Sequence, residues 1–122
     1  MSTALSYNWA DLRRVFYSSL IREDRAVIEA LLASMWRQFC DQITEESTIP
    51  GLESFILLSN RCEVTISGQE VMIAPVRGEM PGSITCIDVV GENNQAVKSA
   101  HQALHSFVRK LNLEQMMREV GR

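Results

Sequence analysis

The chain has 122 residues, of which 46% are apolar and 22% charged, and its net charge is −3 at pH 7. This length and composition fit one folded domain, residues 1–122, and exclude a disordered chain. The three cysteines form no Cys-x-x-Cys pair, which argues against a disulfide-stapled framework. The chain starts without the features of a cleaved signal peptide and has no apolar run long enough to cross a membrane, so we expect a cytoplasmic protein.

The charges are distributed unevenly along the chain. Residues 1–44 are neutral overall, with five basic and five acidic side chains, and residues 92–122 carry five basic against three acidic ones. Residues 45–91 have two arginines against seven carboxylates, a net charge of −5. Because an acidic block repels phosphate, we do not expect a nucleic-acid surface on this part of the chain.

The placement of glycine and proline divides the chain into three blocks. Residues 1–49 contain neither, which predicts a helical block over residues 1–48, before a strand block (49–91) and a last helix (92–122). Asn8 is a good N-cap for the first helix, and Asp11 stands three residues later, as in a capping box. Apolar residues at spacings of three and four then form one face of this helix: Trp9, Leu12, Phe16 and Leu20.

The helical block forms one long helix or two shorter ones. Its apolar pattern is interrupted at Arg22–Arg25, so either the helix runs on to about residue 44, or it bends and Asp24 caps a second helix. The second segment has the most regular apolar face, with Trp36 on its flank: Ile28, Leu31, Leu32, Met35, Phe39 and Ile43. This pattern favours a helix packed on the core; a short coiled-coil seam for a partner is the alternative.

The strand block predicts a four-stranded, mainly antiparallel meander. Turn residues bound the four segments Leu52–Leu58, Cys62–Ile66, Glu70–Val76 and Ile84–Val90. The first segment is apolar on both faces at its end, and the second alternates apolar and polar residues like a half-buried strand. A tight turn is expected at Ser67-Gly68, and the longest loop is expected over 77–82.

The last block predicts a long helix that begins at an asparagine cap in Asn93-Asn94. One face of it is apolar: Val97, Ala100, Leu104, Phe107, Val108 and Leu111. A short terminal helical turn is expected over Leu113–Val120. The expected fold class is therefore α+β, with the N-terminal helical block, a four-stranded sheet and the long C-terminal helix packed on one face.

Candidate catalytic and metal-binding residues are few. His101 and His105 share one helix face at the spacing of metal ligands, but Gln102 stands where metalloprotease helices carry a glutamate base, so structural histidines are favoured. Asp88 is the one acidic residue inside an apolar strand, and Cys86 lies beside it. An enzyme using Asp88, His101 and Cys86 around one pocket is a third-ranked hypothesis. We expect no catalytic residues, no metal and no cofactor.

The other two cysteines and the long loop also favour structural roles. Cys40 and Cys62 fall on apolar sides of their elements, as buried small side chains do. The loop 77–82 resembles a mobile binding loop beside a sheet, but it lacks the two-glycine spacing and lysine of a phosphate loop. A long strand connection is the favoured interpretation.

The predicted layout is similar to two families in element order alone. Type III secretion chaperones are small acidic homodimers with a C-terminal helix, but they carry a helix between the third and fourth strands, where this chain has only Arg77–Gly82. The double-stranded-RNA-binding domain has helix, three strands and helix, and residues 31–111 follow that order. Its last helix opens with a basic cluster, whereas Asn93–Lys98 contains one lysine.

The function expected from these patterns is that of a non-enzymatic protein–protein interaction module, such as an adaptor, a dedicated chaperone or an inhibitor. The helical block offers more apolar face than one core of this size is expected to cover, and homodimerisation is the commonest way to bury the excess. The expected partner-binding residues are Trp9, Leu12, Phe16, Tyr17, Leu20, Ile21 and Trp36. The alternative is binding of double-stranded RNA through basic helix residues: Arg13, Arg14, Lys98, Arg109 and Lys110.

Overall fold

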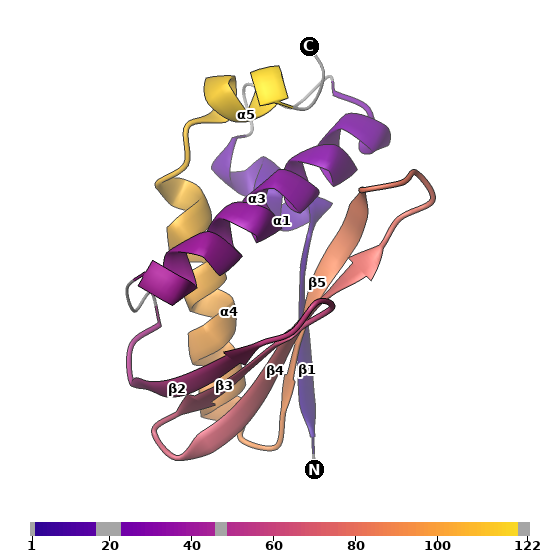
Figure 1. The fold of residues 1–122 in the computed structure, drawn as a ribbon. Helices are drawn as coiled ribbons and strands as arrows, with labels where there is room; N and C mark the ends of the chain where they lie inside the picture. Colours follow the sequence, from indigo (N-terminus) through magenta and orange to yellow (C-terminus); the bar gives the residue numbers. More distant parts are fainter. Residues whose placement is uncertain (1, 17–22, 46–48, 120–122) are drawn as a thin grey trace.

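A five-stranded antiparallel sheet forms one layer of the molecule, and helices cover one of its faces (Figure 1). The computed structural model describes residues 2–16, 23–45 and 49–119. The strands are β1 (Thr3–Asn8), β2 (Leu52–Leu57), β3 (Cys62–Ile66), β4 (Gln69–Arg77) and β5 (Ile84–Gly91). The helices described are α1 (Trp9–Val15), α3 (Arg25–Glu45), α4 (Asn94–Arg109) and α5 (Leu113–Glu119). The α+β class is thus confirmed.

The sheet has one strand more than the sequence analysis predicts. The order is β1-β5-β4-β3-β2, so the predicted meander is present and β1 is added beside β5, pairing Thr3 with Gly91 and Asn8 with Cys86. The prediction of four strands is therefore wrong in number. The missed strand is as long as β2, but half of its residues are polar and only Leu5 and Tyr7 mark its apolar side, so its pattern is too weak to separate it from an irregular segment.

The helical block contains two described helices. Asn8 caps α1 through a capping box: its side chain accepts from the amides of Ala10 and Asp11, and the Asp11 carboxylate accepts from the Asn8 amide. Helix α1 ends at Val15, and Asp24 caps α3 by accepting from the Val27 amide at 3.0 Å. The two-helix alternative with Asp24 as cap is therefore the one observed.

The predicted turn and strand ends of the meander agree with the structure to within one or two residues. Ser67 and Gly68 both have positive φ, 50° and 79°, which is the conformation of a type I′ turn between two antiparallel strands. This turn joins β3 to β4, and the register then pairs Val64 with Val71 and Cys62 with Ile73. All four of these side chains are buried against the helices.

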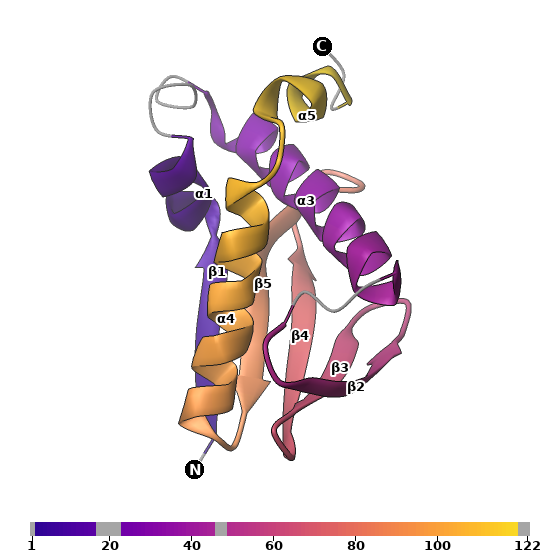
Figure 2. The same ribbon diagram turned by 90° about the vertical axis from the view of Figure 1, so that its left-hand side faces the viewer.

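Helix α4 forms the main cover of the sheet. Asn93 caps it by accepting from the Ala96 amide at 2.9 Å, and its apolar stripe is buried on β1, β5 and β4. Figure 2 shows α4 running along β1 and β5, with α3 crossing the same face diagonally. The predicted packing of the C-terminal helix on one face is confirmed. The short helix α5 packs on α3 and buries Met116.

Candidate interaction surface

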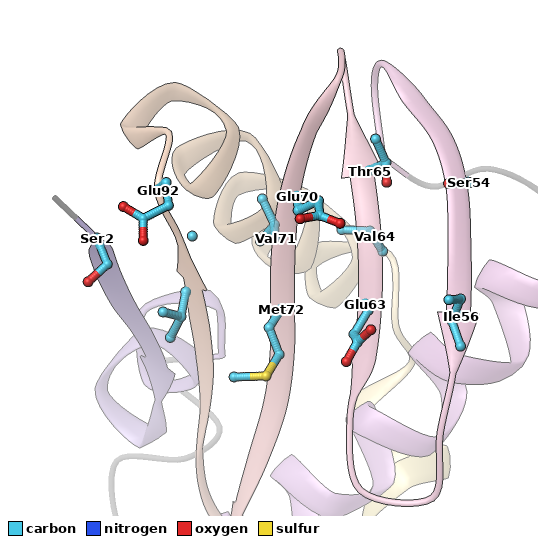
Figure 3. A pocket seen from close by; sticks show the side chains of 12 residues that line it. Ser2, Ser54, Ile56, Glu63, Val64, Thr65, Glu70, Val71, Met72 and Glu92 are labelled. Carbon is cyan, nitrogen blue, oxygen red and sulfur yellow. The ribbon is translucent and has the colours of Figure 1, made fainter.

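The face of the sheet opposite the helices has no helix over it among the described residues, and the strand register forms a continuous row of residues across all five strands. Figure 3 shows three of these side chains, those of Ile56, Glu63 and Met72. The strand register places Ile56 of β2 beside Glu63, then Met72, Val90 and finally Ala4 of β1. A second row on the same face joins Ser54, Thr65 and Glu70. We call this side the open face.

A shallow depression of about 370 Å³ lies on the open face. Ile56 and Met72 belong to its apolar lining, and it also carries three glutamates: Glu63 on β3, Glu70 on β4 and Glu92 just after β5 (Figure 3). No lysine or arginine is among the described residues that line it. Glu63 is paired with Arg61 at 2.8 Å outside this lining. We call this site the acidic depression; its electrostatics favour a cation over an anion.

Strand β2 forms an edge of the sheet and exposes apolar side chains on both faces. Phe55 is 36% exposed, Ile56 58%, Leu57 40% and Leu58 39%. Phe55 and Leu57 pair with the buried residues Val64 and Cys62 and therefore lie on the helix side, whereas Ile56 lies on the open face. We call these four consecutive residues, 55–58, the β2 edge patch.

The β2 edge patch is exposed because the helical cover ends before it. Helix α4 lies on β1, β5 and β4, and the main sheet contact of α3 is with β5 (Figure 2). Beneath the helices the inward side chains of β3 are buried, but the next strand outward is exposed at every position from Glu53 to Leu57. The apolar sequence of β2 is thus on the surface and not in the core.

The backbone of β2 also has free hydrogen-bonding capacity along its outer side. The Leu58 amide donates to the Arg61 carbonyl at 2.8 Å, closing the β2–β3 hairpin. In an antiparallel ladder, hydrogen-bonded and non-hydrogen-bonded pairs alternate, so Ile56 directs its backbone groups toward β3. The backbone N–H and C=O of Phe55 and Leu57 therefore point away from the sheet.

The residues expected to bind a partner are only partly on the surface. Leu12 and Trp36 are buried in the core, Trp36 stacked on Phe39 with ring centroids 6.1 Å apart. Both side chains pack within this chain, where α1 contacts α3 and α4 and α3 contacts β5, and a role for them in binding a partner stays a prediction. Trp9 and Phe16 are half-buried against the core, and the Arg13 guanidinium lies over the Trp9 ring. Tyr17, Leu20 and Ile21 lie outside the described residues.

The two histidines are in structural positions at the β1 edge. The Tyr7 hydroxyl is hydrogen-bonded to His105 Nδ1 at 3.2 Å, and His101 Nε2 lies 3.2 Å from the Ser6 carbonyl oxygen. A carbonyl oxygen only accepts, so His101 Nε2 carries the hydrogen. Burial raises the pKa of Tyr7 and lowers that of His105. The described residues contain no group of three side chains able to hold a metal ion.

The hypothetical catalytic set is not brought together. Cys86 and Asp88 lie on the open face, where Cys86 Sγ is 3.7 Å from Asp88 Oδ1, whereas His101 is on α4 across the sheet. Burial raises the pKa of Cys86, and it raises that of Cys40 to about 12 and that of Cys62 to about 11. Near neutral pH these thiols stay protonated and are therefore poor nucleophiles.

The basic residues proposed to bind RNA are divided between two helices. Arg13 donates to the Glu23 carbonyl at 2.9 Å and Arg14 pairs with Asp11, so both are engaged within the chain. Lys98 and Lys110 line a shallow groove on the outer side of α4 together with uncharged polar residues. This arrangement lacks a dense cationic cluster, and nucleic-acid binding stays a prediction.

The loop between β4 and β5 lines another groove, together with Trp36 and the β2–β3 turn. Its conformation is closed internally, because Gly78 donates to the Ser83 carbonyl and Ser83 Oγ donates to the Met80 carbonyl. The groove holds Arg77 and Glu79 but neither histidine nor cysteine. None of the catalytic candidates from the sequence, Cys86, Asp88 and His101, lines it.

Sequence reasoning missed the β2 edge patch as a surface, although a signal was present. Four consecutive apolar residues at the end of a predicted strand are unusual for an alternating half-buried strand. The same run also fits a strand that is buried on both faces. A buried strand and an exposed edge strand differ only in which helices lie over them.

Comparisons with protein-family models, with curated proteins and with solved structures found no match for this chain. None of the helices that the structure describes has the length and apolar character needed to cross a membrane.

Proposed function

We propose that this chain is a non-enzymatic protein-interaction module that binds its partner at the β2 edge patch. The observation that carries the proposal is the exposure of Phe55, Ile56, Leu57 and Leu58 along an unpaired sheet edge. Natural proteins usually protect such an edge with lysine, proline, a bulge or a covering element. Here the start of β2 is protected by a bulge near Glu53 and by the charge of Glu53. Residues 55–58 contain no charge, proline or bulge.

The physical basis of binding is the removal of apolar surface from water. Burying a leucine, isoleucine or phenylalanine side chain contributes about 1.5–3 kcal/mol when the side chain starts fully exposed. The β2 edge patch starts partly exposed, so its contribution is smaller, and the outward backbone groups of Phe55 and Leu57 add hydrogen bonds. The proposal moves the binding surface from the N-terminal helices to the sheet edge. The expected homodimer stays a prediction.

Photo-crosslinking tests this function. A photo-reactive amino acid in place of Leu57, on the edge, is compared with the same amino acid in place of Gln102, which is exposed on α4. Irradiation in an extract of the native host is expected to yield discrete protein adducts from position 57 only. Absence of adducts at position 57, or the same adducts from both positions, would reject the proposal.

A further inference from the structure

We infer that β2 accepts an extended, cationic segment of another protein as a sixth strand of the sheet. This inference rests on the protein-interaction function proposed above and specifies the chemistry of the partner. The segment carries apolar side chains on the helix side of the sheet and lysine or arginine on the open face.

Strand addition is favoured by the backbone of β2. The N–H and C=O groups of Phe55 and Leu57 point away from β3, and an added strand pairs with them in the pattern of an ordinary ladder. Main-chain pairing of this kind is independent of the partner's side chains, which then set specificity. The edge offers the geometry without any rearrangement of the sheet.

The two-sided exposure of the β2 edge patch distinguishes a strand from a helix. A helix laid on the open face covers Ile56 but leaves Phe55 and Leu57 in water. A helix docked on the opposite side covers Phe55 and Leu57 but leaves Ile56, the most exposed of the patch. An extended segment at the edge, with alternating side chains, contacts both sides at once.

The charge of the partner follows from the acidic depression. Glu63 lies in the same row as Ile56, directly inward from it, and Glu70 lies in the row of Ser54 (Figure 3). The added strand lies two strand spacings, roughly 10 Å, from β3. A lysine or arginine beside Ile56 covers that side chain with its stem and extends its charge toward the acidic depression. Arg61 offsets the charge of Glu63 there, so the net negative charge comes from Glu70 and Glu92.

A second copy of the chain fits this charge pattern poorly. Pairing of β2 with β2 of another copy adds three further glutamates to the continuous open face. The basic residue that it brings near the edge is Arg61, which is already paired with Glu63. A cationic segment from a different protein therefore complements the site, and self-pairing does not.

A synthetic peptide tests the inference directly. The probe is a peptide of about nine residues with alternating lysine and valine, long enough to span one strand. The controls are the same peptide with glutamate for every lysine, and one with a central proline. In fluorescence titrations with the full chain, we expect both controls to bind at least tenfold more weakly, and added salt to weaken the lysine peptide.

Variants of the chain locate the binding site. Leu57→Pro removes an outward N–H while leaving the pairing with β3, because proline is tolerated on an edge strand where its nitrogen faces solvent. Ile56→Lys keeps the backbone and repels the cationic peptide. Both are expected to lower affinity at least tenfold. Met80→Lys, the same chemical change at a loop position 63% exposed, is the matched control and is expected to stay within twofold of the wild type.

Amide hydrogen exchange supplies a signature specific to strand addition. The peptide is expected to slow exchange at the Phe55 and Leu57 amides. The Ile56 amide, already directed toward β3, is expected to change little. A peptide that only adsorbs to the acidic depression would not protect alternate amides of β2. If the saturated complex shows no such alternating protection, the inference is wrong.

Other outcomes overturn the inference without touching the proposed function. Equal binding of the glutamate peptide, or undiminished binding by Ile56→Lys, removes the cationic strand. The inference is also wrong if sedimentation shows a dimer that the Ile56→Lys variant fails to form and that the lysine peptide does not dissociate. That result would assign the β2 edge to a second copy of the chain. If the peptide fails to bind while crosslinking at position 57 still captures a protein, strand addition is wrong and the interaction function stands.

Discussion

The two edge strands of this sheet each carry one aromatic residue on the helix side, and the two residues have opposite environments. Tyr7 of β1 is fully buried under α4, with its ring against His101 and His105. Phe55 of β2 remains more than a third exposed. Apolar content does not explain this difference, because the exposed strand, β2, is the more apolar of the two. Burial at an edge is therefore decided by the helices placed over it, and here they protect one edge and leave the other accessible.

Removing each aromatic side chain measures the difference between the edges. Tyr7→Ala is expected to lower the free energy of unfolding by about 3–5 kcal/mol, because it leaves a cavity under α4. Phe55→Ala is expected to cost less than Tyr7→Ala, about 1–2 kcal/mol, because part of its side chain is already in water in the folded chain. Urea unfolding of both variants gives the two values. Similar losses would show that β2 is covered in solution.

The connection that follows β1 is expected to contribute more to the stability of the fold than the turn that follows β2. Asn8→Ala removes the cap of α1 and should cost about 1 kcal/mol. Asn60→Ala, in the exposed turn after β2, should be close to neutral. Thermal unfolding of the pair tests this expectation, and a loss at Asn60 equal to that at Asn8 would contradict it.

The β1 edge should also respond to pH. The His105 pKa lies below its ordinary value of 6.5 because burial disfavours the imidazolium and Arg14 repels it. The unfolded chain then binds this proton at a higher pH than the folded one. The contribution of His105 to stability is full above about pH 6.5 and is lost as the pH falls toward the lower native pKa. His105→Gln should reduce the slope of stability against pH in this window; an unchanged slope would assign it to other groups.

The smallest effect is expected from a charge on the exposed edge. Ile56→Lys should change the free energy of unfolding by no more than about 0.5 kcal/mol, because the side chain is largely in water in the folded chain. Chemical denaturation measures this change. A large loss of unfolding free energy would mean that Ile56 is buried in solution, for example against a second chain, and that the two edges are equally covered.

Much of the fold is visible in local patterns, and the candidate surface is not. The turn at Ser67-Gly68 and the caps at Asn8 and Asn93 follow from residue chemistry within a few positions, and all three are observed. Strand β1 is too polar to be recognised alone, because its identity depends on pairing with β5, which lies far along the chain.

The environment of an amphipathic residue is likewise a long-range property. Leu12 and Trp36 carry the apolar pattern of a helix face, and that pattern is the same whether the face meets the sheet or a partner. The exposure of Leu57 cannot be read from its neighbours, because it depends on where α4 and α3 lie over the sheet. For this reason the sequence predicts the elements better than it predicts the surface.

The position of β1 in the sheet has a consequence for the order in which the molecule assembles. Thr3 pairs with Gly91, so β1 finds its neighbour only after β5 has been synthesised. The β2–β5 meander has local connections and closes short loops, whereas β1 closes a loop that contains most of the chain, which is entropically costly and slow. Until that step, β5 is itself an uncovered edge. Before β1 pairs, the edges of the nascent sheet are therefore β5 and β2, and β1 replaces β5 as an edge in the finished molecule.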